Sequence, residues 1–412
     1  MYRFETGGQD ASHRANNHQS YDEERRQSIF IQPKSVLESL YSDIEGCQKF
    51  RNFYDVLRGG TDCSDFQPLL ICEVALCRAM ATIALKLLIL FCAFLPFGSL
   101  LSVAQCIEPS IRREWRQFST EEKSAWISAV KCLTTFPHTD LLAPSVDPSL
   151  SLMPPVNTSS TYYDDFVYMH MDLNIRIHST GYFLPFHRWY VAVYEQVLKE
   201  KCNYMGVSPY WNWSIDSTDV FDSDFFKDSD PTSGLGGWGD PSKDFSVTDG
   251  AFSDFMVAYP NPHILRRNFS VQPWSYVGDL NGFNTYPETY ANTTFTPDVI
   301  SAMINGYVGD YVGFQADFEK SQGAHEPLFW MHHAMVDKVW YDWQNANPVN
   351  FWAFFGGATS ALQNVSYADK YPNGGPPFLS INDTIPADGL FNETMIYNVM
   401  NTTGGYLCYV YE

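Results

Sequence analysis

Three histidines recur at short intervals in the middle of the chain, and a pair follows far downstream. The first three are His170, His178 and His187, and the pair is His332 and His333. A single buried histidine is an ordinary core residue. The chain of 412 residues contains only ten histidines, so this regular spacing indicates a shared function. Neutral imidazole is the commonest metal ligand in proteins, and we interpret these residues as a metal site.

Helical periodicity predicts that two of these histidines point into the core. One helix has Pro185 in its first turn and runs to about residue 199. A last helix runs from Pro327 to about residue 344. Each has an apolar face at spacings of three and four residues. These faces consist of His187, Val191, Tyr194 and Leu198 in the first helix and of His333, Val336, Trp340 and Trp343 in the last. A metal ion is one common way to satisfy an imidazole that is buried without a partner.

A third helix completes a bundle of the kind that holds internal metal ions. It runs from Tyr162 to about residue 174 and carries His170, while His178 comes from the loop that follows. No cysteine lies near these histidines in the sequence, and the carboxylates adjoin the starts of helices. An all-imidazole ligand set suits copper, zinc or nickel, of which copper binds most tightly. The residues alone therefore predict a buried multi-histidine metal site.

The remaining sequence predicts one helical domain with long loops. Residues 119–133 form a helix with a Ser119 cap and Glu122 at the capping-box position. Residues 214–250 are rich in Asp, Ser and Gly and predict a long solvated loop without the ligand pattern of a calcium site. The tail after residue 350 has short apolar runs among Gly, Pro and Asn.

The composition argues against anionic partners. With 45% hydrophobic and 16% aromatic residues, the chain can bury a large core. Its formal net charge of −21 repels nucleic acid and anionic membranes. We therefore expect no nucleic-acid partner.

The N-terminal part divides into two segments. Residues 1–79 are polar and without a helical or strand period, and we interpret them as a non-native or disordered extension. Residues 80–104 have the layout of a secretory signal peptide, with a small-residue cleavage site at its end. The alternative is an uncleaved membrane anchor, because the uncharged residues 87–105 are long enough to span a bilayer. We favour cleavage, which predicts a secreted, extracellular protein whose mature domain is residues 105–412.

Cysteines and glycosylation sequons also fit an oxidising compartment. Four cysteines follow the signal segment, an even number that allows three pairings. We favour Cys106–Cys408, which ties the termini together, and Cys132–Cys202, which braces two helices. Asn-x-Ser/Thr sequons, each a candidate for an N-glycan, follow at Asn157, Asn212, Asn268, Asn292, Asn364, Asn382, Asn392 and Asn401. We expect Asn212, which lies between two tryptophans, to be buried.

The order of these motifs closely resembles that of the tyrosinase and catechol oxidase family. The three early histidines with "FLPFHR", and later "EPLFWMHHAMVDKVWYDWQ", are similar to the two copper boxes of that family. Further similar stretches are "REWRQFSTEEKSAWISAVKCL", "SPYWNWSID", "HILRRNF" and the terminal "LCYVY". The resemblance covers about residues 106–412 and is to the short secreted fungal members. It implies a mainly α fold, in which a central four-helix bundle holds a dicopper site, with long loops and a few short strands.

The resemblance also implies a reaction. Two copper ions each accept one electron from the substrate, an o-diphenol or o-aminophenol, while dioxygen is reduced to water. An o-diphenol thereby becomes an o-quinone. The substrates are thus a small phenol and O2, and no flavin or nicotinamide is needed. Hydroxylation of monophenols by the same site stays an open possibility.

Ligands of both coppers follow from the same resemblance. The first copper takes His170, His178 and His187. The second takes His325 and His333. His332 faces elsewhere, because adjacent residues of a helix diverge by about 100°.

Three further residues are implied to act beside the coppers. Phe329, one turn before His333, would form an aromatic wall over the metal. Asp337, one turn after His333, would orient an imidazole through a hydrogen bond. Glu195 would do the same or would pair with Arg188.

The chain departs from the family pattern at two positions. Many fungal members have a cysteine that is crosslinked to the second histidine by a thioether, whereas here Arg176 stands in its place and His178 is held by packing alone. The second copper also lacks a ligand, because the sequence runs from His325 straight to the His-His pair. His263 is a poor substitute, since the charge of two neighbouring arginines opposes a cation.

Three hypotheses follow for the function. The first is a secreted copper oxidase of o-diphenols or o-aminophenols. The second is a catalytically impaired, non-enzymatic secreted glycoprotein that keeps the tyrosinase fold. The third is an oxygen carrier, which would need both coppers.

Overall fold

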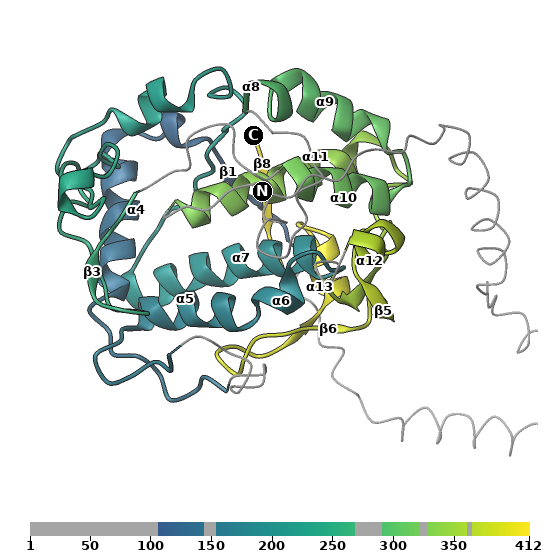
Figure 1. Cartoon of the computed structure of the whole chain (residues 1–412), viewed down its shortest axis with the longest axis horizontal. Coiled ribbons are helices and arrows are strands. Elements are labelled where there is room, and N and C mark those ends of the chain that lie inside the picture. Colours follow the sequence, from purple (N-terminus) through teal and green to yellow (C-terminus); the bar gives the residue numbers. More distant parts are fainter. Residues whose placement is uncertain (1–105, 144–153, 268–290, 322–327, 361–364) are drawn as a thin grey trace, which may run out of the picture. The chain divides into compact units, whose positions relative to one another are not determined.

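Helices make up most of the regular structure in this computed structural model, which describes residues 106–143, 154–267, 291–321, 328–360 and 365–412 (Figure 1). All of these residues belong to one compact unit, Ser99–Glu412. The predicted extension of residues 1–79, the signal segment of residues 80–104 and His325 lie outside the described residues. The mainly α fold that the sequence predicts is confirmed.

The four helices predicted from the sequence are present, and the structure adds further helices that were not predicted. The α-helices in the described residues are α4 (Thr120–Leu133), α5 (Tyr162–Asp172), α6 (Asn174–Ile177), α7 (Phe183–Cys202), α8 (Ala291–Thr294), α9 (Pro297–Gly306), α10 (Tyr311–Ser321), α11 (Phe329–Ala346), α12 (Val365–Lys370) and α13 (Ile396–Met400). The four predicted helices are α4, α5, α7 and α11. Short 3-10 turns lie at Trp115–Gln117, Val220–Asp222, Asp224–Phe226 and Pro241–Lys243.

Local capping explains where two of these helices begin. The Ser119 side chain accepts a hydrogen bond from the backbone N–H of Glu122, whose carboxylate accepts one from Ser119 in return. The same reciprocal arrangement links Thr161 and Asp164 at the start of α5. The predicted helix from residue 162 to about 174 in fact ends at Asp172 and is followed by the short helix α6.

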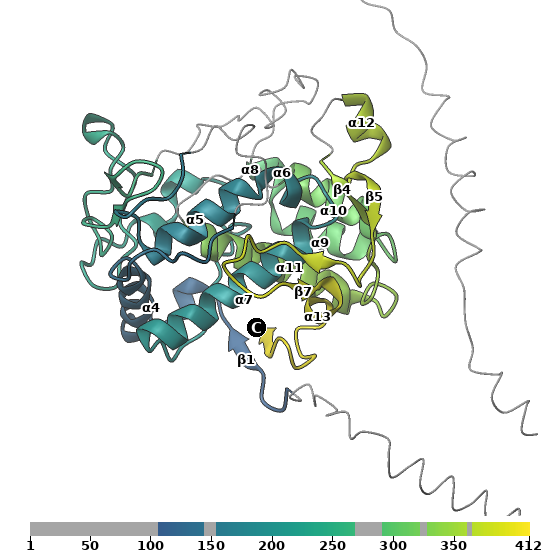
Figure 2. The ribbon, with the colours of Figure 1, turned by 90° about the horizontal axis from the view of Figure 1, so that it is seen from below.

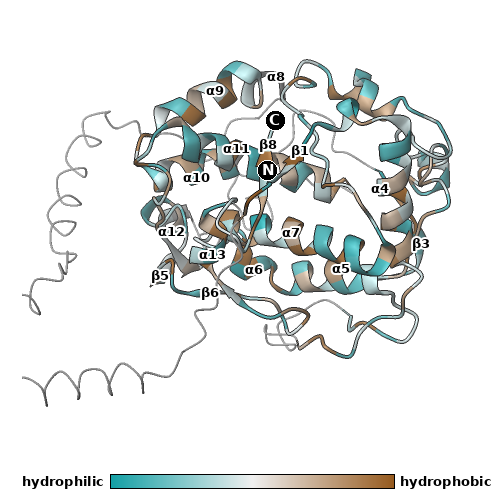
Figure 3. Ribbon diagram, turned by 180° about the vertical axis from the view of Figure 1, so that it is seen from behind, coloured by the Kyte–Doolittle hydropathy of each residue, from teal (hydrophilic) through white to brown (hydrophobic). Residues whose placement is uncertain are grey.

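Aromatic rings fill the space between four helices. Phe166 of α5 contacts Tyr190 and Tyr194 of α7, and Trp330 of α11 stacks on Tyr194 with ring centroids 3.5 Å apart. On the other side of α11, the rings of α10 complete the bundle: Phe314 stacks on Trp343 at 4.6 Å. Figure 1 shows α5, α7 and α11 running close together, and Figure 3 shows that these helices carry both hydrophobic and hydrophilic stretches. Burial of these rings supplies the main stabilisation of the fold.

The strands are short and pair in twos. They are β1 (Ser110–Arg112), β2 (Met256–Val257), β3 (His263–Ile264), β4 (Gly356–Thr359), β5 (Gly375–Leu379), β6 (Thr384–Ile385), β7 (Thr394–Met395) and β8 (Tyr409–Tyr411). β1 pairs in parallel with β8, while β2–β3, β4–β5 and β6–β7 are antiparallel. The first described strand therefore lies beside the C-terminal end of the chain (Figure 2).

Both predicted disulfides are confirmed. Cys106 is bonded to Cys408, next to the β1–β8 pair. Cys132 near the end of α4 is bonded to Cys202 at the end of α7, so this bond braces two helices. Each bond closes a long loop and thereby restricts the unfolded chain.

The prediction of a solvated loop over residues 214–250 is wrong in part. The segment is irregular, but Phe225, Phe226, Leu235 and Val247 are buried in the core. The buried guanidinium of Arg267 donates hydrogen bonds to the carbonyl oxygens of Leu235, Gly236 and Gly237. Irregular backbone can be buried when its carbonyls find such a donor, and a search for periodicity misses it. Asn212, expected to be buried, is only half-buried.

The described helices carry no candidate for a membrane crossing: within this part of the chain, none is both long and apolar enough. The segment of residues 87–105, for which an anchor is the alternative, lies outside it.

Candidate metal centre

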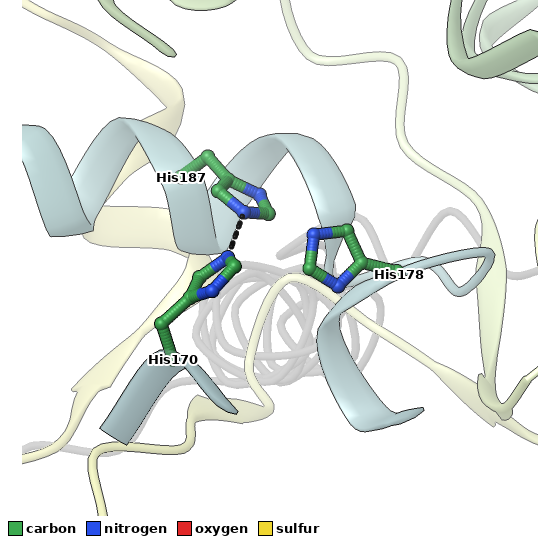
Figure 4. A group of neighbouring side chains, drawn as sticks. All are labelled: His170, His178 and His187. Carbon is green, nitrogen blue, oxygen red and sulfur yellow. Dashed lines mark hydrogen bonds between the residues drawn. The ribbon is translucent and has the colours of Figure 1, made fainter. Parts of the chain in front are cut away.

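Three of the predicted ligands meet between the helices. His170 lies near the end of α5, His187 lies in the first turns of α7, and His178 follows α6 in the turn between them. His187 is fully buried, and the other two are half-buried. Figure 4 shows the three rings turned toward a common centre.

Distances between the rings fit ligands of one ion. One nitrogen from each of His170, His178 and His187 lies within 4.8 Å of the others. Nε2 of His170 and Nε2 of His187 are 3.2 Å apart. Two nitrogens bound to one metal at about 2.0–2.1 Å and at a tetrahedral angle lie about 3.3 Å apart. Because all three donors are imidazoles, the group fits copper or zinc better than a hard cation such as Mg²⁺.

Backbone carbonyls determine which nitrogen of two rings is free to bind. Nδ1 of His187 lies 2.7 Å from the carbonyl oxygen of Phe183, and Nδ1 of His178 lies 3.0 Å from that of Asn174. A carbonyl only accepts hydrogen bonds, so Nδ1 carries the proton and Nε2 keeps its lone pair. The bond to Asn174 also corrects one expectation, because His178 is held by this hydrogen bond as well as by packing.

Burial keeps these imidazoles in the neutral form that binds metals. It lowers the pKa of His170, of His187 and of His333 well below the usual histidine value, and neighbouring histidines lower each pKa further. A proton therefore competes weakly with a metal ion at these rings.

His333 joins this cluster from α11. Its ring stacks on that of His187, with centroids 4.0 Å apart. Its Nδ1 is buried and has no hydrogen-bond partner among the described residues. A buried nitrogen with no partner is costly, and a metal ion would satisfy it. The ring centroid of the neighbouring His332 is 4.9 Å from that of His333 and 6.4 Å from that of Trp213.

Phe329 lies against the imidazoles, as predicted. Its ring centroid is 4.3 Å from that of His333 and 4.7 Å from that of His170. This contact places an apolar ring surface directly beside the histidine cluster.

Among the described residues, the hydrogen bonds of Asp337 go to partners other than the imidazole that was predicted. Asp337 is buried, and its Oδ1 accepts from Nε of Arg188. Its Oδ2 accepts from the hydroxyl groups of Tyr409, at 2.5 Å, and Tyr411, at 2.7 Å, and from Arg112 at 3.4 Å. Both carboxylate oxygens therefore have partners on other elements. Asp337 links α11 to α7, β1 and β8.

Glu195 likewise contacts neither an imidazole nor Arg188 in the part of the chain that the structure describes; its partners are Arg112, Lys199 and Ser208. Its Oε2 accepts from Arg112 at 3.0 Å and from the backbone N–H of Ser208 at 2.9 Å, and its Oε1 accepts from Lys199. Burial alone would raise the pKa of Glu195, but the charges of Arg112 and Lys199 lower it to about 2. Arg112 thus joins two buried carboxylates, one on α7 and one on α11.

Sequence reasoning missed Arg112 and the two terminal tyrosines in this network. The only signal was the terminal "LCYVY", whose alternation places Tyr409 and Tyr411 on one face of a strand. Nothing in the local sequence indicated that this face meets α11.

Replacement of Asp337 by alanine is expected to lower the free energy of unfolding by about 3–5 kcal/mol, because the buried Arg188 loses its counter-charge. Denaturant unfolding measures this change. The control is Asp342→Ala on the same helix, which removes only the Lys338 partner of a less buried pair and is expected to cost about 0–1 kcal/mol. Equal losses in the two variants would contradict the assignment of Asp337 to a buried network.

Taken together, these features define a class of protein: a helical domain that holds a cluster of buried histidines suited to a transition metal. Comparison with known proteins gives the family. The model of the common central domain of tyrosinase matches residues 160–326 and 319–346. The tyrosinase-like protein phomQ1' of Diaporthe leptostromiformis is 31% identical over 333 residues, which cover 75% of this chain and 81% of that protein. Tyrosinase P of Aspergillus terreus is 28% identical over 74% of this chain and 93% of that protein.

The chain belongs to the tyrosinase family. Members of this family are oxidoreductases that bind two copper ions. Among solved structures, a variant polyphenol oxidase from Thermothelomyces thermophila is similar at 26% identity, with a TM-score of 0.47 over 75% of this chain and 91% of that one.

Proposed function

We propose that the protein is a secreted copper oxidase that converts o-diphenols to o-quinones or o-aminophenols to o-quinone imines, with hydroxylation of monophenols as a further reaction of the same site. Two diphenols supply four electrons and four protons, which reduce one dioxygen to two waters. The observation that carries the proposal is the cluster of His170, His178 and His187, whose nitrogens converge beside His333. A relative named N-acetyl-6-hydroxytryptophan oxidase, from Emericella nidulans, is 26% identical and agrees with a phenolic substrate.

Copper, when bound, supplies the one-electron acceptors and the binding site for dioxygen. The chain's own residues would prepare that site. His170, His178 and His187 would hold the first ion through neutral imidazoles. The bond from His187 Nδ1–H to the Phe183 carbonyl makes Nε2 more basic and fixes the plane of the ring. Phe329 would exclude water from the face of His333 that it covers.

The second copper is proposed to take His333 and His325, with one ligand missing. Two observations support this. In the sequence, His325 is followed after seven residues by His333, without the segment that the family pattern contains. In addition, the family model matches the chain in two separate segments, residues 160–326 and 319–346, which overlap at residues 319–326. This arrangement limits the turnover expected of the unaltered chain, and its extreme is the alternative of a catalytically impaired glycoprotein with the tyrosinase fold.

Metal analysis and turnover of catechol separate the candidates. The full chain would be expressed in a fungal host with Cu²⁺ in the medium, and copper per chain and quinone formation would be measured. Two coppers with catechol turnover support the oxidase, and two coppers without turnover support an oxygen carrier. One copper or none, with little quinone, supports the impaired protein.

The secreted product is expected to begin near Gln105 and to migrate above its chain mass, because cleavage follows the small-residue site and N-glycans are attached. N-terminal sequencing locates the start, and treatment with an N-glycosidase provides the control for the mass. Recovery of residues 1–79 on the secreted product would contradict this prediction.

A further inference from the structure

The turn that presents His178 has little regular structure of its own. His178 follows α6, a helix of only four residues, and Ser179 after it has a φ of +53°. This left-handed conformation is unfavourable for a residue other than glycine, so it persists only when surrounding contacts enforce it. His170 and His187, in contrast, lie on longer helices.

Helix α10 contacts this turn through two polar side chains. Oε1 of Glu319 accepts a hydrogen bond from the backbone N–H of Ser179 at 2.7 Å. Nε2 of Gln315, one helical turn earlier, donates to the carbonyl oxygen of Thr180 at 2.7 Å. Gln315 is fully buried and also reaches Glu319 at 3.4 Å, so the two side chains form one unit.

Strands β4 and β5 hold the turn on another side. The backbone N–H of Gly181 donates to the carbonyl oxygen of Gly357 at 3.0 Å. The approach is so close that a Cβ added to Gly181 would lie 2.9 Å from Cα of Gly356. Such packing leaves the turn little freedom to move away from α10.

We propose that Glu319 and Gln315 are positioning residues, which hold the backbone after His178 so that its imidazole stays in the first copper site. This inference rests on the proposed copper site. In many fungal members of the family, a thioether to a cysteine holds the second histidine. This chain has Arg176 in place of that cysteine, and we assign the holding role to α10.

The contacts explain why two polar groups occupy a helix face that packs on the core. Phe314 and Phe318, the neighbours of Gln315 and Glu319 on α10, are fully buried. Apolar residues at positions 315 and 319 would leave the Ser179 N–H and the Thr180 carbonyl without these partners. The geometry therefore matches a specific hold on residues 179–180.

Glu319→Ala is expected to weaken binding of Cu²⁺ to the histidine cluster about 10–100-fold, the usual loss when an outer hydrogen-bond partner of a ligand is removed. Glu319→Gln keeps the acceptor that faces Ser179 and is expected to bind Cu²⁺ almost as the unchanged chain does. The matched control is Glu200→Ala, which removes an exposed carboxylate on α7 that accepts a hydrogen bond from Gln196. Titration of the metal-free full chain with Cu²⁺ gives the affinity of the unchanged protein and of the three variants.

A second variant tests the cause. Ser179→Gly removes the penalty of the left-handed conformation. In that background Glu319→Ala is expected to cost less affinity than it does alone. Hydrogen exchange at the amide of residue 179 gives a readout without metal, and Glu319→Ala should accelerate it while exchange in the middle of α7 stays unchanged.

The outcomes are distinguishable. If the unchanged chain binds no Cu²⁺ at the cluster, the proposed copper site is wrong. If it binds Cu²⁺ but Glu319→Ala leaves both affinity and exchange at residue 179 unaltered, the positioning role is wrong. If Glu319→Ala does not fold, weak binding by Glu319→Gln contradicts the role, and binding close to that of the unchanged chain supports it.

Discussion

Insertion of the missing family segment, with one histidine, after His325 is expected to raise copper from about one ion per chain to two and to turn poor catechol oxidation into rapid quinone formation. The unaltered chain offers an intact set of three imidazoles for the first copper. For the second copper it offers His333 and, by the family resemblance, His325.

The physical reason is the number of ligands. Two imidazoles bind a copper ion less tightly than three, and the donor nitrogens must also converge on one position. Oxidation of a diphenol removes two electrons, so a site with one copper lacks the second acceptor. The effect on activity should therefore far exceed the effect on stability.

An insertion of the same length with alanine in place of the histidine is the control. It separates the contribution of the ligand from that of the added chain. Metal analysis, followed by catechol oxidation at matched copper content, provides the measurements. Full oxidase activity of the unaltered chain would refute the prediction and would mean that another residue completes the second site.

His187→Ala is expected to abolish stoichiometric copper at the first site. Loss of an outer partner of a metal ligand typically costs about 10–100-fold in affinity, so loss of a ligand costs at least that much. His187 is the most buried member of the cluster, and its Nε2 lies 3.2 Å from that of His170.

A matched histidine is available for the control. His263 lies on β3, its Nδ1 faces the carbonyl oxygen of Asn261, and it is not part of the cluster. His263→Ala should leave the copper content as it was, and this result would also exclude His263 as the missing ligand. An unchanged copper content in His187→Ala would overturn the assignment of the first site.

Much of the site could be predicted because its signals are local. The spacing of apolar residues placed His187 and His333 on inward faces, and both are buried in the structure. A helix repeats every 3.6 residues whatever it packs against, so the direction of a side chain follows from its neighbours in the sequence. Capping residues marked the start of α4, because a capping box involves only residues close together in the sequence. The resemblance of the motifs then identified the family.

The roles of Asp337 and Glu195 could not be predicted in this way. Periodicity placed both residues beside the inward faces, but not their partners. Arg112 lies 225 residues from Asp337 and 83 residues from Glu195 in the sequence. A buried carboxylate pairs with whichever donor the fold brings to it, and here that donor came from the β1–β8 pair.

The sequence by itself determined that this chain is helical, that its histidines are suited to a metal site and that it resembles the tyrosinases, because residue type, spacing and motif order carry that information. Tertiary structure alone decided that α10 holds the turn after His178 and that Arg112 joins two helices through their carboxylates. Those contacts depend on segments that are distant in the chain and meet only when the helices pack.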